Sequence, residues 1–217
     1  MMTKSMLIVK FGGSSIASPD LHKWVQAIEK TTRPLVVVPG GGPFANTVRQ
    51  FQTRIGYDGE AAYRMALLAM EQFGHALVAL GQKLVPARTL EAIESAQARG
   101  FVPVWMPYEM ISSSEGVEHN WNVTSDSVAA WLAARLPGSP LCLIKQIDVP
   151  AGSSLQAISA AGVVDPSFVA FLHPSTRVYV AGPSDLAVSG RRFGEGVVPG
   201  REVSSEQPHT AFAEAAQ

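Results

Sequence analysis

The chain of 217 residues has one cysteine, Cys142, and no long apolar run. A single cysteine cannot form an internal disulfide, and in an apolar stretch it is most often a small buried hydrophobe. No segment approaches the roughly 20 apolar residues that span a bilayer. The first apolar stretch ends at Lys10 rather than at a small-residue cleavage site, unlike a signal peptide. We therefore expect a cytoplasmic protein with no membrane contact.

Basic and acidic side chains are nearly equal in number. Lys and Arg number 17 against 18 Asp and Glu, which leaves a formal net charge of −1. Proteins that bind nucleic acid electrostatically carry a basic excess, so we expect no nucleic-acid partner. His75 and His119 have no neighbours in a metal-ligand pattern, and no Cys/His cluster suggests zinc. We expect no metal held by protein side chains.

Short apolar runs alternate with longer amphipathic ones along the chain. The pattern predicts strands over residues 6–11, 35–38, 101–106, 141–149 and 177–181. It predicts helices over residues 20–31, 43–53, 60–80, 89–99, 124–136, 155–160 and 167–172, and a loop-rich tail after residue 182. This alternation predicts an α/β fold, a three-layer αβα sandwich with a mostly parallel central sheet. We expect a single domain over residues 1–217, and homo-oligomers through the apolar helix 60–80.

Two glycine-rich turns follow the first two predicted strands, at the sheet edge where ligands of parallel sheets bind. In the first, Lys10 ends the strand and Gly12, Gly13 and Ser14 follow it. A lysine in an apolar strand is costly without a partner, although it can also extend to solvent. The second turn consists of Gly40, Gly41 and Gly42. Its amides can bind an anion at the start of a helix, but three glycines can also serve only a tight turn.

A third candidate lies at the start of the predicted helix 124–136. Asp126 occupies its first turn, and Asn122 comes four residues earlier. An aspartate there can simply cap a helix, so by itself this position has two interpretations.

Together these motifs resemble the amino acid kinase family, over nearly the whole chain. The family has a lysine-glycine-glycine-serine turn, a glycine triplet, and an asparagine and an aspartate four apart before an Ala/Leu-rich helix. The resemblance implies an enzyme that transfers phosphate from ATP with Mg²⁺ to a small phosphate or carboxylate acceptor. It implies an acceptor-binding lobe over residues 1–138 and a nucleotide-binding lobe over 139–217. By the same resemblance, Lys10 binds the transferring group, the glycine amides stabilise its oxygens, Asp126 orients Lys10, and Asn122 contacts the acceptor.

The chain departs from the family on the nucleotide side. Where relatives carry Thr-Asp-Val-Asp-Gly, this chain has Lys145-Gln146-Ile147-Asp148-Val149, and the family's second lysine motif has no counterpart. We expect Asp148 to contact the nucleotide and Lys145 to supply the missing cation. Leu143 and Ile147 share the predicted strand face of Lys145, so an unpaired ammonium there would be costly. The alternative is that Lys145 is paired structurally with Asp148 or another carboxylate.

Shorter similarities favour one branch of the family. The helix 60–80, the lysine-bearing strand and the segment "VVDPSF" resemble the small kinases linked to methanofuran biosynthesis, which act on aminomethylfuran methyl phosphate. Arg64 is a candidate acceptor-phosphate ligand, although it can equally be an exposed helix arginine. A non-catalytic nucleotide- or anion-binding or storage protein on the same fold is the alternative function. A nicotinamide-dependent oxidoreductase would require a dinucleotide-binding glycine fingerprint, which we do not find.

Overall fold

The computed structural model describes residues 5–205 of the chain. Its strands are β1 (Leu7–Phe11), β2 (Leu35–Pro39), β3 (Leu84–Ala87), β4 (Val102–Trp105), β5 (Leu141–Ile144), β6 (Val178–Ala181) and β7 (Arg201–Val203). Its α-helices are α1 (Leu21–Ile28), α2 (Gly42–Ile55), α3 (Gly59–Leu80), α4 (Leu90–Ala98), α5 (Tyr108–Ser112), α6 (Ser125–Arg135), α7 (Leu155–Ala160), α8 (Phe168–Phe171) and α9 (Leu186–Gly194). Short 3-10 helices cover Gly13–Ala17 and Pro183–Asp185. In this part of the chain no helix is long and apolar enough to cross a membrane.

The strands form one seven-stranded sheet with the order β3-β4-β2-β1-β5-β6-β7. Every pairing is parallel except that of β7 with β6. β1 is central and pairs with both β2 and β5, so the ends of these three strands meet at one edge. The predicted α/β fold with a mostly parallel sheet is confirmed. Residues 1–138 contribute β1 to β4, and residues 139–217 contribute β5 to β7.

Side-chain alternation along β1 divides the core between two faces of the sheet. Leu7, Val9 and Phe11 belong to the apolar cluster that also contains residues of α1 and α9. Ile8 belongs to the opposite cluster, with the apolar residues of α6. Lys10 follows Ile8 by two residues, so its side chain lies on the α6 face.

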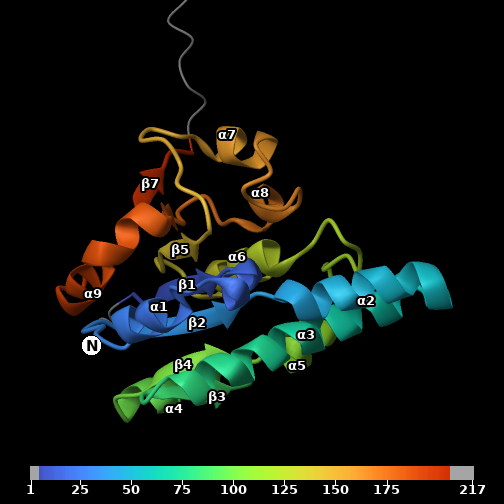
Figure 1. The fold of residues 1–217 in the computed structure, drawn as a ribbon, viewed down its shortest axis with the longest axis horizontal. Helices are drawn as coiled ribbons and strands as arrows, with labels where there is room; N and C mark the ends of the chain where they lie inside the picture. Colours follow the sequence, from blue (N-terminus) through green and yellow to red (C-terminus); the bar gives the residue numbers. More distant parts are fainter. Residues whose placement is uncertain (1–4, 206–217) are drawn as a thin grey trace, which may run out of the picture.

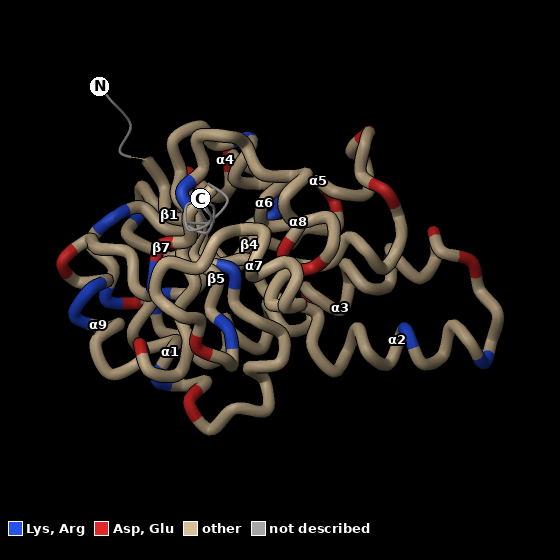
Figure 2. Tube along the Cα trace, turned by 90° about the horizontal axis from the view of Figure 1, so that it is seen from above, with Lys and Arg blue, Asp and Glu red and all other residues tan. Residues whose placement is uncertain are grey.

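Helices α2 and α3 lie side by side and extend beyond the sheet (Figure 1). Asp58 begins α3 as its N-cap, with a carboxylate that accepts a hydrogen bond from the Ala61 amide at 2.7 Å. Lysines, arginines, aspartates and glutamates are interspersed along the trace, in keeping with the balanced charge of the sequence (Figure 2). The α2–α3 pair builds a wall at the sheet edge where the glycine-rich turns lie.

Some predicted elements were wrong. The strand predicted over residues 141–149 ends at Ile144, and Ile147 lies outside it with 51% of its surface exposed. Sequence reasoning also missed β3, whose Pro86 is unfavourable in a strand. It missed the short α5, and it assigned α9 to a loop-rich tail. Helix α9 contains Gly190 and Gly194 and is stabilised by packing against α1.

Candidate active site

Lys10 and Lys145 meet because β1 and β5 are neighbours in the sheet. Lys10 lies opposite Leu143 in the β1–β5 register. Side chains alternate along a strand, so Lys145, two residues beyond Leu143, points to the same face as Lys10. The Lys145 amide still donates to the Ala181 carbonyl at 2.9 Å, which keeps its backbone at the sheet edge although β5 has ended.

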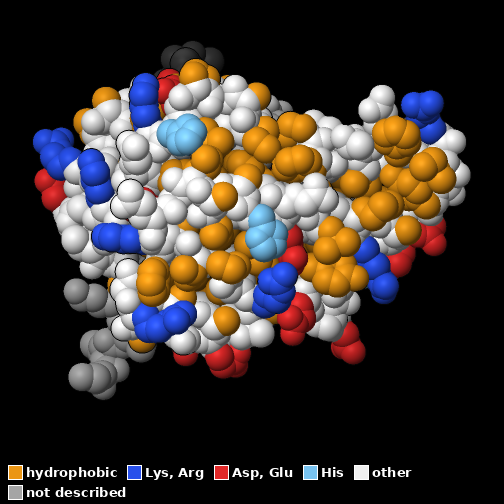
Figure 3. All heavy atoms as spheres, turned by 60° about the horizontal axis from the view of Figure 1, so that its bottom comes forward, with side chains coloured by type: hydrophobic (Ala, Val, Ile, Leu, Met, Phe, Trp, Pro, Cys, Tyr) orange, Lys and Arg blue, Asp and Glu red, His pale blue; other side chains and the backbone are white. Residues whose placement is uncertain are grey.

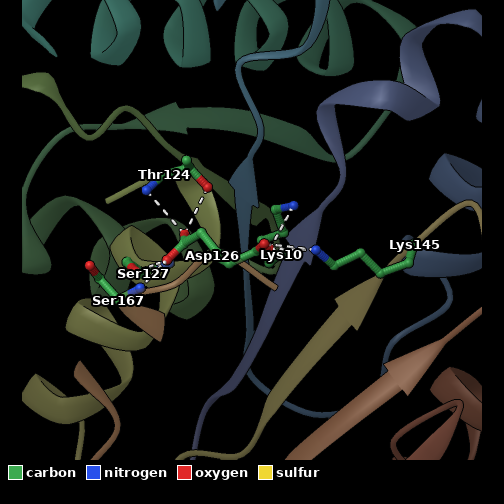
Figure 4. Close-up of polar contacts among 7 residues, drawn as sticks. Lys10, Thr124, Asp126, Ser127, Lys145 and Ser167 are labelled. Carbon is green, nitrogen blue, oxygen red and sulfur yellow. Dashed lines mark hydrogen bonds and ion pairs between the residues drawn. The ribbon is translucent and has the colours of Figure 1, made fainter. Parts of the chain in front are cut away.

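Asp126 joins the two lysines. It lies in the first turn of α6, and one of its carboxylate oxygens is 2.8 Å from Lys10 Nζ. Lys145 Nζ lies 2.8 Å from each carboxylate oxygen (Figure 4). Lys10 and Asp126 are only 4% and 5% exposed. The partner of Lys145 is therefore Asp126, whereas Asp148 binds elsewhere.

Two groups at this site, Asp126 and Lys145, have shifted pKa values. Burial alone would raise the pKa of Asp126, but the charges of Lys10 and Lys145 outweigh burial and hold that pKa below its ordinary value. Burial and, after it, the nearby charge of Lys10 lower the pKa of Lys145, and Asp126 opposes them, with a net pKa of about 8. Asp126 is thus an anion at neutral pH, and Lys145 is a cation that can lose its proton at mildly alkaline pH.

The two glycine-rich turns pack against each other, backbone to backbone. A Cβ on Gly13 would lie 2.1 Å from the Gly42 nitrogen, and a Cβ on Gly40 would lie 2.3 Å from the Gly13 nitrogen. Gly42 has a φ of 51°, in the left-handed region that favours glycine. The amides of Gly12 and Gly40 donate to the carbonyls of Ile144 and Phe11. These two amides are occupied within the fold.

The residues of the two turns, except Gly40, line a cavity of about 440 Å³. Gly13, Ser14, Gly41 and Gly42 contribute to its wall, together with Lys10 and Lys145. Within residues 5–205 the amides of Gly13, Gly41 and Gly42 donate to no protein acceptor. Gly42 is also the first residue of the 14-residue helix α2. Free amides, a helix N-terminus and two ammonium groups are all suited to phosphate oxygens.

The opposite wall was missed by sequence reasoning. Arg49 of α2 lies over the ring of Trp121, 4.3 Å from its centroid, and the Trp121 indole donates to Gln52 Oε1 at 2.7 Å. Tyr63 of α3 is buried in the same wall, and its hydroxyl has no partner in the described part of the chain. The only local signal was a tryptophan among the polar residues that precede α6.

Five predicted site residues are not part of the cavity wall: Asp126, which contacts the two lysines of the wall, and Gly40, Arg64, Asn122 and Asp148. Arg64 is exposed and pairs with Glu60 at 2.7 Å, and Asn122 is exposed in the loop before α6. Asp148 accepts hydrogen bonds from the Ser184 amide at 3.1 Å and from its hydroxyl at 2.7 Å. The structure therefore brings together Lys10, Asp126, Lys145 and the glycine turns, but not Arg64, Asn122 and Asp148.

The chain is similar in sequence to known proteins. A sequence profile of the amino acid kinase family matches residues 5–149, the segment from β1 through the loop after β5. The chain is 26% identical over 162 residues to (5-(aminomethyl)furan-3-yl)methyl phosphate kinase of Methanocaldococcus jannaschii. That alignment covers 71% of this chain and 74% of the relative.

Solved structures share the fold. Uridylate kinase from Archaeoglobus fulgidus superposes with a TM-score of 0.68 at 16% identity, covering 93% of this chain and 100% of that one. UMP kinase from Ureaplasma parvum gives 0.60 at 16% identity, with 83% and 91% covered. An isopentenyl phosphate kinase gives 0.58 at 16% identity, with 91% and 100% covered. The chain belongs to the amino acid kinase family and is a small-molecule kinase, the class of phosphotransferase that its motifs predicted.

Proposed function

We propose that the chain transfers the γ-phosphoryl group of ATP to a small phosphate or carboxylate acceptor, and that this acceptor is (5-(aminomethyl)furan-3-yl)methyl phosphate. The observation that carries the proposal is one buried carboxylate, Asp126, shared by two lysines in the wall of a glycine-lined cavity. Two ammonium groups and one carboxylate leave a net positive charge there. The furan acceptor is the one named for the relative from M. jannaschii, and it would place the enzyme in methanofuran-type cofactor biosynthesis.

Phosphoryl transfer to such an acceptor depends on positioning the reactants and stabilising phosphate charge more than on proton transfer. A phosphate or carboxylate acceptor is already an anionic nucleophile at neutral pH. One of its oxygens bonds to the γ-phosphorus while the bond to the β,γ-bridging oxygen breaks, and ADP leaves with that electron pair. We assign Lys10 and the free glycine amides to the transferring group, and Lys145 to the nucleotide phosphates. Asp126 holds both ammonium groups and, with its lowered pKa, stays ionised.

Magnesium is proposed to enter with ATP. The cavity wall offers ammonium groups and backbone amides, which bind phosphate oxygens rather than a metal ion. Asp126, the carboxylate beside them, already contacts both lysines. In kinase sites Mg²⁺ is held largely by phosphates and water, and it neutralises phosphate charge there.

The wall formed by α2, α3 and Trp121 is proposed to bind the acceptor. Leu67 and Met70 give this part of the cavity an apolar surface that suits a small heteroaromatic ring. Arg49 places a guanidinium beside it, a group that binds phosphate through two parallel hydrogen bonds. The unpaired Tyr63 hydroxyl can donate to the acceptor, which would remove the cost of leaving a buried polar group unsatisfied. This surface supports an acceptor that combines a ring with a phosphate.

The nucleotide is proposed to lie over residues 139–217, beyond the carboxyl ends of β5 and β6. Asp148, in the loop after β5, accepts hydrogen bonds from Ser184 in the turn after β6, and these bonds hold the two segments together at this surface. Direct contacts of Asp148 with the nucleotide, and of Arg64 and Asn122 with the acceptor, remain predictions.

A product assay tests the function. Purified protein is incubated with ATP, Mg²⁺ and one acceptor at a time: the furan phosphate, its unphosphorylated alcohol, UMP or isopentenyl phosphate. Mass spectrometry and ³¹P spectra should show ADP and the diphosphate only with the furan phosphate, and Lys10→Ala should abolish product. Tight ATP binding without transfer to any phosphate or carboxylate would refute the kinase proposal in favour of a binding protein.

We also propose a cytoplasmic homo-oligomer, because ATP is supplied in the cytoplasm and exposed apolar residues lie on the α2–α3 pair. Phe51, Ile55 and Leu68 are exposed there, and Figure 3 shows hydrophobic side chains gathered where α2 ends and α3 begins. Light scattering on the purified chain and on Ile55→Glu tests self-association. A monomeric mass for the unaltered chain would refute it.

A further inference from the structure

A second buried carboxylate lies behind the site, outside the cavity. Asp165, in the loop between α7 and α8, is 8% exposed. It accepts hydrogen bonds from the Thr124 amide at 3.0 Å, the Thr124 hydroxyl at 2.7 Å, the Ser127 amide at 3.0 Å and the Ser127 hydroxyl. The Ser167 amide donates to it at 3.2 Å. In Figure 4 the polar groups of Thr124, Ser127 and Ser167 converge through these bonds, beside Asp126.

These contacts make Asp165 the cap of α6. A helix leaves its first amides without partners, and a side chain at the N-cap position usually accepts from the third helical residue. Thr124 holds the N-cap position, but its side chain makes no such bond; its hydroxyl donates outward to Asp165. Ser127, the third helical residue, has its amide satisfied by Asp165 instead. The cap of α6 therefore comes from the other half of the chain.

Capping α6 does not by itself require a buried carboxylate from a distant segment of the chain. Thr124 could cap α6 locally, as Thr89 caps α4 through the Ala92 amide at 3.2 Å. Burying a carboxylate without a cation is costly, and Asp165 forms no ion pair with a basic side chain of residues 5–205. The arrangement fixes the two residues that bracket Asp126 along the helix.

We infer that Asp165 is a positioning residue for phosphoryl transfer, which holds the first turn of α6 so that Asp126 keeps both lysines directed at the cavity. It touches neither lysine and does not line the cavity. Its effect on turnover rests on the proposed function. Its effect on how Lys10 and Lys145 are held does not depend on that function, so the effect on turnover and the effect on the lysines can be measured separately.

The test compares Asp165→Asn with a cap variant far from the site, Thr89→Ala. Asparagine keeps the shape of the side chain, but its amide nitrogen cannot accept from the serine and threonine donors. Competitive labelling with acetic anhydride, read by peptide mass, reports the reactivity of Lys10 and Lys145 without any substrate. Lys23, which is exposed and paired with Asp20, serves as the internal reference. Labelling and kinetics are measured well below the melting temperature of each variant.

Asp165→Asn should raise the labelling of Lys10 and Lys145 severalfold relative to Lys23. It should lower kcat for the furan phosphate at least about tenfold, with the KM for ATP changed by less than about threefold. Thr89→Ala should lose thermal stability without changing either readout. If Asp165→Asn does not fold, Ser127→Ala removes one of the hydroxyl donors and should shift labelling in the same direction.

Unchanged labelling and unchanged kcat in folded Asp165→Asn would refute the positioning role, as would equal changes in Thr89→Ala. If the unaltered chain transfers phosphate to no acceptor, the proposed function fails, and the labelling of the two lysines alone decides the role of Asp165.

Discussion

Replacing Lys145 by methionine separates the catalytic role of this residue from its structural one. Methionine keeps much of the length of the side chain and removes the charge. The chain lacks the family's usual second lysine, and Lys145 is proposed to take over its charge; both hydrogen bonds of its side chain go to Asp126. The two interpretations left open by the sequence, a nucleotide-phosphate ligand or a structural partner of a carboxylate, predict different outcomes for this variant.

The structure sets the expected size of each effect. Loss of one preorganised charge contact to a transition state costs about 10²–10³ in kcat, or about 3–4 kcal/mol of barrier. The effect on stability should be smaller, because Asp126 keeps Lys10 at 2.8 Å and is not left as an unpaired buried charge. The substitution also removes the repulsion between two ammonium groups that lowers the pKa of Lys145. We therefore expect the free energy of unfolding to change by no more than about 1 kcal/mol.

The pH dependence provides a second signature. The folded-state pKa of Lys145 is about 8, below an unfolded-state value of about 10.4. Between these values the unfolded chain holds the proton and the folded protein has released it. This residue therefore makes the protein more stable as pH rises, by at most about 1.4 kcal/mol per pH unit. Turnover should fall over the same range, because a neutral amine no longer stabilises phosphate charge.

The assay combines initial rates with the furan phosphate and ATP, urea unfolding, and both measurements from pH 7 to 10. Lys23→Met, at an exposed site, controls for the loss of a lysine in general. A folded Lys145→Met that turns over normally would refute the catalytic assignment and make the residue structural. If Lys145→Met turns over more slowly but its rate still falls with rising pH as it does in the unaltered chain, a group other than Lys145 titrates in this range.

Asp126→Asn should leave two buried ammonium groups without their carboxylate and lower the free energy of unfolding by about 3–5 kcal/mol; an unchanged urea midpoint would contradict the shared ion pair. Arg49→Ala should raise the KM for the furan phosphate by about tenfold to a hundredfold, the effect of one charged hydrogen bond, and leave the KM for ATP unchanged. An equal rise for both substrates would remove Arg49 from the acceptor wall. Gly13→Ala should destabilise the protein by about 1–3 kcal/mol in urea unfolding, because its Cβ would lie 2.1 Å from the Gly42 nitrogen; a normal midpoint would argue against the packed glycine turns.

The parts of the site that were predictable from the sequence lie at local boundaries. A lysine at the end of an apolar strand, glycines directly after strands and an aspartate at a helix start are each visible in a short window. The structure places Lys10, Gly13 and Gly42 in the cavity wall and Asp126 behind it, 2.8 Å from Lys10 Nζ. The α/β fold was equally visible, because the alternation of strand and helix patterns fixes the layer arrangement.

What the sequence left undetermined depends on contacts between distant segments. Lys145 could be assigned to the right sheet edge, but its partner follows from the β1–β5 register and from the position of α6. Arg49 and Trp121 meet only because a loop folds back onto α2. Asp165 acts on a helix that precedes it by almost 40 positions in sequence, as its bond to Ser127 shows. No window-based pattern contains such pairs.

The two edges of the sheet limit how copies of the chain can join. At one edge, β3 carries Pro86, which has no amide hydrogen to offer a neighbouring strand. At the other, β7 has only three residues, and two of them, Arg201 and Glu202, are charged. Short strands, proline and charge at sheet edges oppose the addition of a strand from another molecule. Association by extending the sheet is therefore disfavoured at both ends, so a stable assembly of this kinase would have to form through its helices.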